Sequence, residues 1–347
     1  MTPTPPATPS PATRFFALLA RFGLDWFLLA LLAVVALAYL APAIGSKASP
    51  VPWEAVTSLG VALIFFLYGL RLSPEKLRLG MRNWRLHALV QLSTFALFPL
   101  LGLALRPWLG GAGSDEALWI SIFYLCTLPS TVSTSVVMVS IAGGNMPAAI
   151  FNASISSLLG IVLTPLWVSA VLHTGSGGGS VGGLVLDLTL QVLAPVVLGV
   201  ALHGRYGAWA ERHKAGLRRF DQIIILLMVY TSFCESFARD VFRSYGWTEL
   251  LGLAAGMVAL FLLVYGLITA LSRLLGFSPE DRLTAVFCGS KKSLVHGTVL
   301  AKVLFAGSAV TGTLLLPLML YHALQIVLAS SLAQSQGRRH AAATVAG

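Results

Sequence analysis

The sequence predicts an all-α polytopic membrane protein with ten transmembrane helices, arranged as two inverted five-helix repeats. Three observations support this prediction. Of the 347 residues, 56% are hydrophobic and only 10% are charged, whereas a soluble globular domain has roughly 25% charged residues. Apolar stretches of about 20 residues, the length that spans a bilayer, occur ten times along the chain. A Gly- and Ser-rich segment then divides these stretches into five and five.

The candidate spans follow one another with short polar segments between them. They lie near 24–42, 55–72, 84–105, 116–140, 147–172, 184–204, 220–240, 248–274, 282–305 and 309–333. Before them, residues 1–13 are rich in Pro and Thr and predict a disordered tail without a signal-peptide pattern. The segment 173–183, HTGSGGGSVGG, predicts a flexible linker. We expect it to join a first repeat at 14–172 to a second at 184–333, followed by a cytoplasmic tail at 334–347.

The basic residues orient these spans in the bilayer. The net charge is +10, but the Lys and Arg residues lie mostly in short segments between apolar runs, so we expect a lipid bilayer and no nucleic acid as partner. With both termini in the cytoplasm, 16 Lys and Arg face the cytoplasm and four face the other side, as the positive-inside rule requires. An odd number of spans per repeat then inverts the second repeat. Inverted repeats are typical of secondary transporters, whose binding site lies at the repeat interface.

Other classes of chemistry have little support in the sequence. Cys126, Cys234 and Cys288 lie in apolar segments without metal-ligand spacing, so we expect neither a disulfide framework nor a zinc site. The chain has no HExxH zinc motif, and its GxSxG match, GGSVG at 178–182, lies in the Gly- and Ser-rich segment rather than in the strand–turn–helix context of a nucleophile elbow. An intramembrane enzyme is therefore disfavoured, and no cofactor is predicted beyond a coupling ion.

Polar and helix-weakening residues interrupt the fourth span of each repeat. The first interruption reads TLPSTVSTS at 127–135, where Pro129 removes a backbone donor. The second reads FCGSKKSLVHG at 287–297. Irregular backbone at membrane depth is tolerated only where it lines a cavity or is buried in protein. We predict that both helices unwind here and cross each other, with a packed Pro129 kink as the alternative for the first.

The second interruption contains two adjacent lysines, Lys291 and Lys292. A lysine at the centre of a span costs roughly 2.5–3.5 kcal/mol on insertion scales. Neighbouring positions on a helix point about 100° apart, so both side chains cannot reach the same interface. At least one ammonium group must therefore meet an anion, a carboxylate or a water-filled cavity.

The predicted substrate and ion site groups the polar residues of both interruptions with polar residues of neighbouring spans. Its members are Thr94, Ser130, Thr131, Ser133, Thr134, Ser135, Asn152, Ser290, Lys291, Lys292 and Ser293. Gln91, Glu235 and His296 are secondary candidates. Glu235 is a candidate carboxylate partner for the lysines, and the alternative is a solvated position at the end of its helix.

These segments also carry a family resemblance. TLPSTVSTSVV, GGNMPAAIFNAS and FCGSKKSLVHGTVLAKVLF, together with FALFP and YTSFCESF, resemble the bile acid:sodium symporter superfamily. More narrowly, they are similar to its orphan branch, akin to the seventh member of solute carrier family 10 and its bacterial relatives. The resemblance covers about residues 15–333. It implies a panel domain of spans 1, 2, 6 and 7, a core domain with unwound crossing helices 4 and 9, and a place in a bacterial cytoplasmic membrane.

The resemblance also implies where coupling ions bind. In sodium-coupled members the crossover holds two sodium ions, and their possible ligands fall on Ser133, Thr134, Ser135 and Asn152. The family's Gln on span 3 falls on Thr94. On span 9 the family's Glu falls on Phe287 and its Gln on Lys291. Because lysine supplies three donors and no acceptor, a tethered ammonium could take the place of a sodium ion.

The predicted function is secondary active transport of a small organic anion by alternating access. Coupling to sodium or to protons is left open. The alternative is a non-transporting membrane regulator, in which the lysines form a structural charge network with Glu235. Nothing in the sequence distinguishes a monomer from a dimer.

Overall fold

The computed structural model describes residues 26–71, 83–109, 116–172, 194–240, 246–305 and 311–346. Throughout these ranges the regular structure is helical and contains no strand. The elements are α2 (Trp26–Leu40), α3 (Pro42–Gly45), α4 (Trp53–Arg71), α6 (Trp84–Leu92), the π-helix η1 (Ser93–Leu97), α7 (Phe98–Ala104), α8 (Arg106–Leu109), α9 (Glu116–Thr127), α10 (Ser133–Ala142), α11 (Met146–Leu172), α13 (Ala194–Arg212), α14 (Lys214–Ala238), α15 (Trp247–Leu274), α16 (Pro279–Gly289), α17 (Leu294–Leu304) and α18 (Thr311–Ala346). The tail predicted at 1–13 and the linker predicted at 173–183 lie outside the described residues.

Six helical stretches of the described chain are long and apolar enough to cross a membrane. They are Trp53–Arg71, Trp84–Ala104, Met146–Val171, Lys214–Ala238, Trp247–Leu274 and Thr311–Arg338. The prediction of a helical, polytopic membrane protein is therefore confirmed, whereas the count of ten spans and the inverted repeat stay predictions. Two further predicted spans are divided by breaks at 128–132 and 290–293, so neither half is as long as a bilayer is thick.

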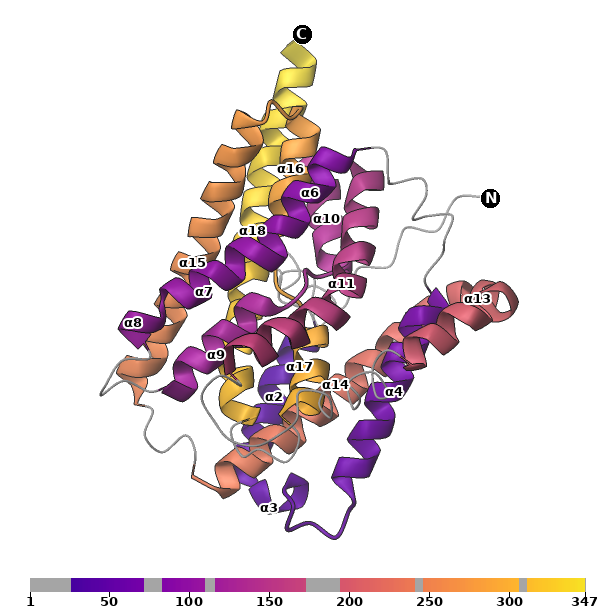
Figure 1. Cartoon of the computed structure of the whole chain (residues 1–347), viewed down its shortest axis with the longest axis vertical. Helices are drawn as coiled ribbons and strands as arrows, with labels where there is room; N and C mark the ends of the chain where they lie inside the picture. Colours follow the sequence, from indigo (N-terminus) through magenta and orange to yellow (C-terminus); the bar gives the residue numbers. More distant parts are fainter. Residues whose placement is uncertain are drawn as a thin grey trace, which may run out of the picture.

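Four helices, α2, α4, α13 and α14, pack on one another. In Figure 1, α4 and α13 run side by side, away from the bundle that contains α6, α10, α15 and α18. A Cβ atom at Gly69 would meet the carbonyl oxygen of Val196, and one at Gly199 would meet that of Phe66. Glycine at these two positions therefore lets the backbones of α4 and α13 touch, as small residues do between membrane helices. These four helices are the spans that the resemblance assigns to the panel domain, and we call them the panel group.

The third span contains a π-helix that the sequence analysis did not predict. Pro99 has no N–H group for the carbonyl of Phe95, which instead accepts a hydrogen bond from Trp167 Nε1 at 2.8 Å. The N–H group of Phe98 bonds to the carbonyl of Ser93 rather than to that of Thr94. The carbonyl of Thr94 is therefore free to accept a hydrogen bond from outside its own helix. Wide turns of this kind are frequent at functional sites.

The two predicted helix interruptions are present in the structure. Helix α9 ends at Thr127 and α10 begins at Ser133, while α16 ends at Gly289 and α17 begins at Leu294. The breaks lie against each other, because the N–H group of Ser293 donates to the carbonyl of Pro129 at 2.9 Å. The Ser293 hydroxyl caps α17 by accepting from the N–H group of His296 at 3.3 Å.

Two boundaries differ from those expected. The basic residues expected in a loop at 205–219 lie on helices, because α13 continues to Arg212 and α14 begins at Lys214. Helix α18 continues to Ala346 through the segment expected as a tail. A hydropathy search ends a span where charges begin, but a helix continues into water for as long as its backbone hydrogen bonds form. The C-terminal end of α18 and helix α3 lie at opposite ends of the molecule (Figure 1).

Candidate functional site

The ammonium group of Lys292 is enclosed by backbone carbonyl groups at the meeting of the two helix breaks. It donates hydrogen bonds to Thr94 at 2.9 Å, to Cys126 at 2.7 Å and to Leu128 at 2.7 Å. The same nitrogen lies 4.1 Å from the centroid of the Phe98 ring, within the range of a cation–π contact. The side chain is fully buried. All three ammonium donors are therefore used, and the positive charge is surrounded by dipoles rather than by a carboxylate. We call this arrangement the carbonyl cage.

The local backbone explains why these carbonyl groups are available. The carbonyl of Thr94 is released by the π-helix. The carbonyls of Cys126 and Leu128 lie at the C-terminal end of α9, where the last carbonyl groups of a helix have no partner within the helix. The N–H group of Ser130, which would continue the helix, donates to Ser156 Oγ at 2.9 Å. The partial negative charge at a helix C-terminus also favours a cation there.

Helix α18 holds the second break in place through residues that the sequence analysis missed. Gln325 accepts a hydrogen bond from the backbone N–H of Lys292 at 2.9 Å and donates to its carbonyl at 2.8 Å. Tyr321 donates its hydroxyl to the carbonyl of Ser290 at 2.8 Å. Both side chains are buried. A signal was present, since residues four apart lie on one helix face and both residues bring a polar group into a predicted span.

Lys291 is equally buried but has a different environment. Its ammonium group donates to the carbonyl of Thr134 at 2.9 Å, and no second acceptor is found among the described residues. The hydroxyl groups of Thr131 and Ser135 lie 2.8 Å apart, and Thr134 donates to Thr131 at 2.7 Å. Lys291 therefore brings a positive charge with spare donors to a cluster of hydroxyl groups at the start of α10.

Most of the other predicted site residues connect the two breaks or line them. Ser130 donates its hydroxyl to the carbonyl of Cys288, so each break bonds to the other. Ser290 bonds back to the carbonyl of Val286 at 2.7 Å, as in an ordinary helix end. The Ser293 hydroxyl lies 3.1 Å from His296 Nδ1. Ser133 is the first residue of α10, and its side chain is outside the described part of the structure.

Asn152 and Gln91 form a separate pair. Gln91 Nε2 donates to Asn152 Oδ1 at 3.1 Å, and Asn152 Nδ2 donates to the carbonyl of Ala148 at 3.0 Å. No hydrogen bond joins this pair to Ser135 or Thr134 in the described part of the chain. Among the described side chains, Asn152 thus has no hydrogen bond to the other possible sodium ligands Thr134 and Ser135, while Lys291 places its ammonium group at the carbonyl of Thr134.

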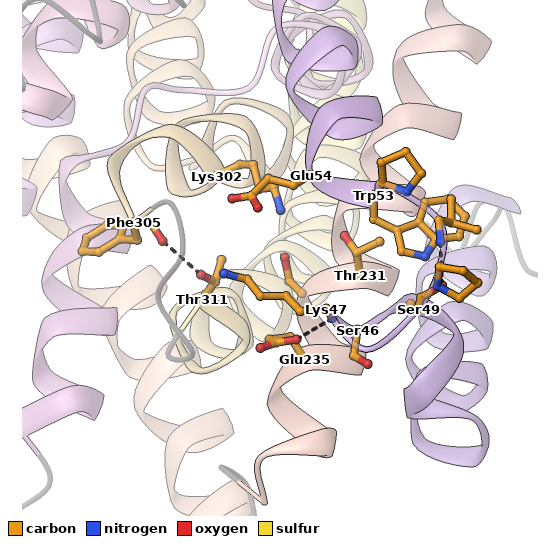
Figure 2. A pocket seen from close by; sticks show the side chains of 15 residues that line it. Ser46, Lys47, Ser49, Trp53, Glu54, Thr231, Glu235, Lys302, Phe305 and Thr311 are labelled. Carbon is orange, nitrogen blue, oxygen red and sulfur yellow. Dashed lines mark hydrogen bonds between the residues drawn. The ribbon is translucent and has the colours of Figure 1, made fainter.

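Glu235 does not lie with the lysines. Its carboxylate accepts from the backbone N–H of Lys47 at 2.9 Å and from Arg239 at 2.7 Å, at the end of α14 near α3. Figure 2 shows this carboxylate beside Lys47, in a cavity that contains neither Lys291 nor Lys292. Neither of these two lysines makes an ion pair within the described ranges. The expectation of a lysine network with Glu235 is therefore not met, and the reading of Glu235 as a residue at a helix end agrees with its geometry.

Comparison with known proteins agrees with this architecture. The model of the SBF-like CPA transporter family matches residues 25–338. An uncharacterized protein of Pseudomonas aeruginosa is 47% identical over 92% of this chain and 95% of its own length. YfeH of Escherichia coli, whose name describes it as a candidate symporter, is 41% identical over 91% of this chain and 94% of its own.

The similarity extends to vertebrate proteins. Sodium/bile acid cotransporter 7 of Xenopus tropicalis is 32% identical over 91% of this chain and 92% of its own length. The residues matched by the family model, 25–338, span both helix breaks. The chain therefore belongs to the SBF-like CPA transporter family, and the resemblance to the bile acid:sodium symporter superfamily is confirmed.

Proposed function

We propose that the protein is a secondary active transporter that moves a small organic anion by alternating access, with a lysine in place of a coupling cation. The observation that carries the proposal is the carbonyl cage around Lys292. Unwound backbone carbonyls coordinate the coupling cation in many secondary transporters. Here backbone carbonyls at the meeting of the two helix breaks surround the ammonium group of Lys292, which is covalently attached to the chain, whereas those transporters bind a dissolved cation.

Lys291 supports the choice of an anion as substrate. Its ammonium group has one neutral acceptor and no carboxylate partner among the described residues. A buried charge without a partner is costly, and a ligand with negative charge would offset that cost. We propose that Lys291 attracts the substrate or carries a coupling proton, while Lys292 holds the two breaks together. The hydroxyl groups of Thr131, Thr134 and Ser135 would bind polar parts of the substrate.

The contact between the panel group and the rest of the molecule supports alternating access. Tyr68 on α4 donates its hydroxyl to the carbonyl of Ser154 at 3.0 Å. Its ring meets the ring of His296 edge to face, with centroids 5.8 Å apart. Near the other end of α4, Glu54 lines an open cavity instead. We propose that the panel group moves against the remaining helices, so that the Tyr68 contact opens when the Glu54 end closes.

Transport by the purified full-length protein in proteoliposomes tests this function. We expect saturable uptake of at least one of succinate, citrate and taurocholate in sodium-free buffer, with a rate that changes when the pH gradient is reversed. Empty liposomes provide the background. The absence of uptake of all three anions would contradict the transport proposal. A saturable requirement for two sodium ions would contradict the lysine substitution.

We also propose that the protein lies in a bacterial cytoplasmic membrane with both termini in the cytoplasm. The basic asymmetry of the sequence supports this orientation, and bacterial relatives support the membrane. Cysteines substituted at Lys47 and Lys214, both exposed, test it with a maleimide that does not cross membranes. We expect Lys47→Cys to label in intact cells and Lys214→Cys to label only after permeabilisation. Labelling of Lys214→Cys in intact cells would reverse the orientation.

A further inference from the structure

A cavity of about 360 Å³ opens between the panel group and the helices that carry the lysines. It lies where α3, the start of α4 and the end of α14 meet the end of α17 and the start of α18. Its lining consists of Gly45, Ser46, Lys47, Ser49, Pro50, Val51, Pro52, Trp53, Glu54, Thr231, Ser232, Glu235, Lys302, Phe305 and Thr311. Both sides of the proposed moving contact thus contribute to one cavity.

The cavity contains the ammonium group of Lys302, which has no hydrogen-bond or ion-pair partner among the described residues. Lys302 lies in the last turn of α17, and in Figure 2 its side chain extends toward Glu54. It makes no hydrogen bond or ion pair with any described residue. Leu294, where α17 begins, is eight residues earlier, which is about 12 Å along a helix. Lys302 is therefore on the same helix as the Lys292 break but near its far end.

The charges around the cavity leave an excess of positive charge. Glu235 is compensated by Arg239, at 2.7 Å, and is also bonded to the backbone of Lys47. This leaves the ammonium groups of Lys47 and Lys302 with the single carboxylate of Glu54. Glu54 lies in the first turn of α4, where the positive end of the helix dipole already favours a carboxylate. Among the described lining residues, two ammonium groups thus share one unpaired carboxylate, an arrangement that favours binding of one further negative charge.

The size and polarity of the cavity restrict the kind of anion. Hydroxyl groups line it, from Ser46, Ser49, Thr231, Ser232 and Thr311. Sites for small molecules range over about 300–1,000 Å³ and are lined mostly by apolar side chains. This cavity is at the small end of that range and has many polar groups. Its lining suits a compact anion with several hydrogen-bonding atoms better than a large apolar one.

We propose that this cavity is an entry site for the transported anion and selects small polar carboxylates, with Lys302 and Lys47 as the binding charges. The proposal rests on the transport function proposed above, whose substrate class it narrows. An anion bound here would contact both the panel group and α17. The proposed movement of the panel group against the remaining helices would then open a path from this cavity toward Lys291.

The charge of the cavity can be tested without knowing the transported substrate. In the full-length protein, Ser49→Cys places a thiol in the half-buried lining, while the natural cysteines Cys126, Cys234 and Cys288 are buried. We expect a negatively charged methanethiosulfonate to modify this thiol about threefold faster than a positively charged one, because two nearby cations attract it. Adding Lys302→Gln should remove the difference. Adding Lys214→Gln, a change at an exposed lysine on the first turn of α14, should leave it unchanged.

Protection of the same thiol tests binding and selectivity. We expect succinate to slow its modification relative to chloride at equal ionic strength, and taurocholate at the same concentration to have no such effect. Lys302→Gln should abolish the protection. The absence of protection by succinate, or equal protection by taurocholate, would overturn the proposed site. A thiol at position 49 that neither methanethiosulfonate modifies would also overturn it. If proteoliposomes take up succinate but succinate does not protect the thiol, the proposed site is wrong and the transport proposal stands. If succinate protects the thiol but no anion is taken up, the site is supported and the transport proposal is contradicted.

Discussion

Replacement of Lys292 by methionine is expected to lower the melting temperature of the protein steeply. Three buried carbonyl groups, those of Thr94, Cys126 and Leu128, would lose their donor at once. Each buried acceptor left without a partner costs about 1–3 kcal/mol. The removal of a desolvated charge offsets part of this loss, so we expect a net destabilisation on the order of 3 kcal/mol. Thermal unfolding of the purified protein in detergent measures it.

Lys291→Met is the matched control for this prediction. It changes the same residue type at the neighbouring position, with the same burial, but it removes a donor from one carbonyl group instead of three. We expect a loss of about 1 kcal/mol or less. If the two variants unfold at the same temperature, the carbonyl cage does not stabilise the breaks in the way described.

Lys291→Gln is expected to reduce transport by about tenfold or more while leaving folding intact. The amide can still donate a hydrogen bond to the carbonyl of Thr134, but it has no charge to attract an anion, and losing one partner of a buried charge pair costs several kcal/mol. Uptake by proteoliposomes at several pH values measures the effect. The melting temperature of the variant shows whether the protein is still folded.

Lys291→Arg separates the two roles proposed for this residue. Arginine retains the positive charge but does not lose its proton in proteins. If Lys291 only attracts the anion, this variant should keep much of the uptake. If Lys291 carries the coupling proton, the variant should bind the anion but lose uptake driven by a pH gradient. Wild-type uptake by both Lys291→Gln and Lys291→Arg would show that the residue has no part in transport.

The helix breaks could be predicted from the sequence because their causes are local. Pro129 lacks a backbone donor, and Gly289 precedes polar residues and two lysines that are costly in an apolar helix. Both features are visible in a few consecutive letters. The membrane class could be predicted in the same way, because hydropathy sums over single residues and does not depend on packing.

The partners of the lysines could not be predicted, because they come from segments far apart in the chain. Lys292 is 198 residues from Thr94 and 166 from Cys126. Its contact with Thr94 also needs a π-helix that depends on Pro99 and on Trp167, from two different helices. The sequence offered Glu235 as a candidate carboxylate partner because it lies within a predicted span. The structure instead satisfies the charge with backbone dipoles, which every residue has and which no sequence pattern reveals.

The carbonyl cage has a consequence for how the protein responds to its surroundings. A dissolved cation occupies a site to an extent set by its concentration, whereas the ammonium group of Lys292 is linked to the chain and has a high effective concentration at all times. The cage is therefore filled at any salinity, and the contact between the two helix breaks does not depend on a dissolved cation. Because the ammonium group of Lys292 cannot dissociate and cross the membrane, it cannot couple transport to an ion gradient as a dissolved cation does. In the proposed transport cycle, uphill movement of the substrate would then need a different gradient, such as a proton gradient coupled through Lys291.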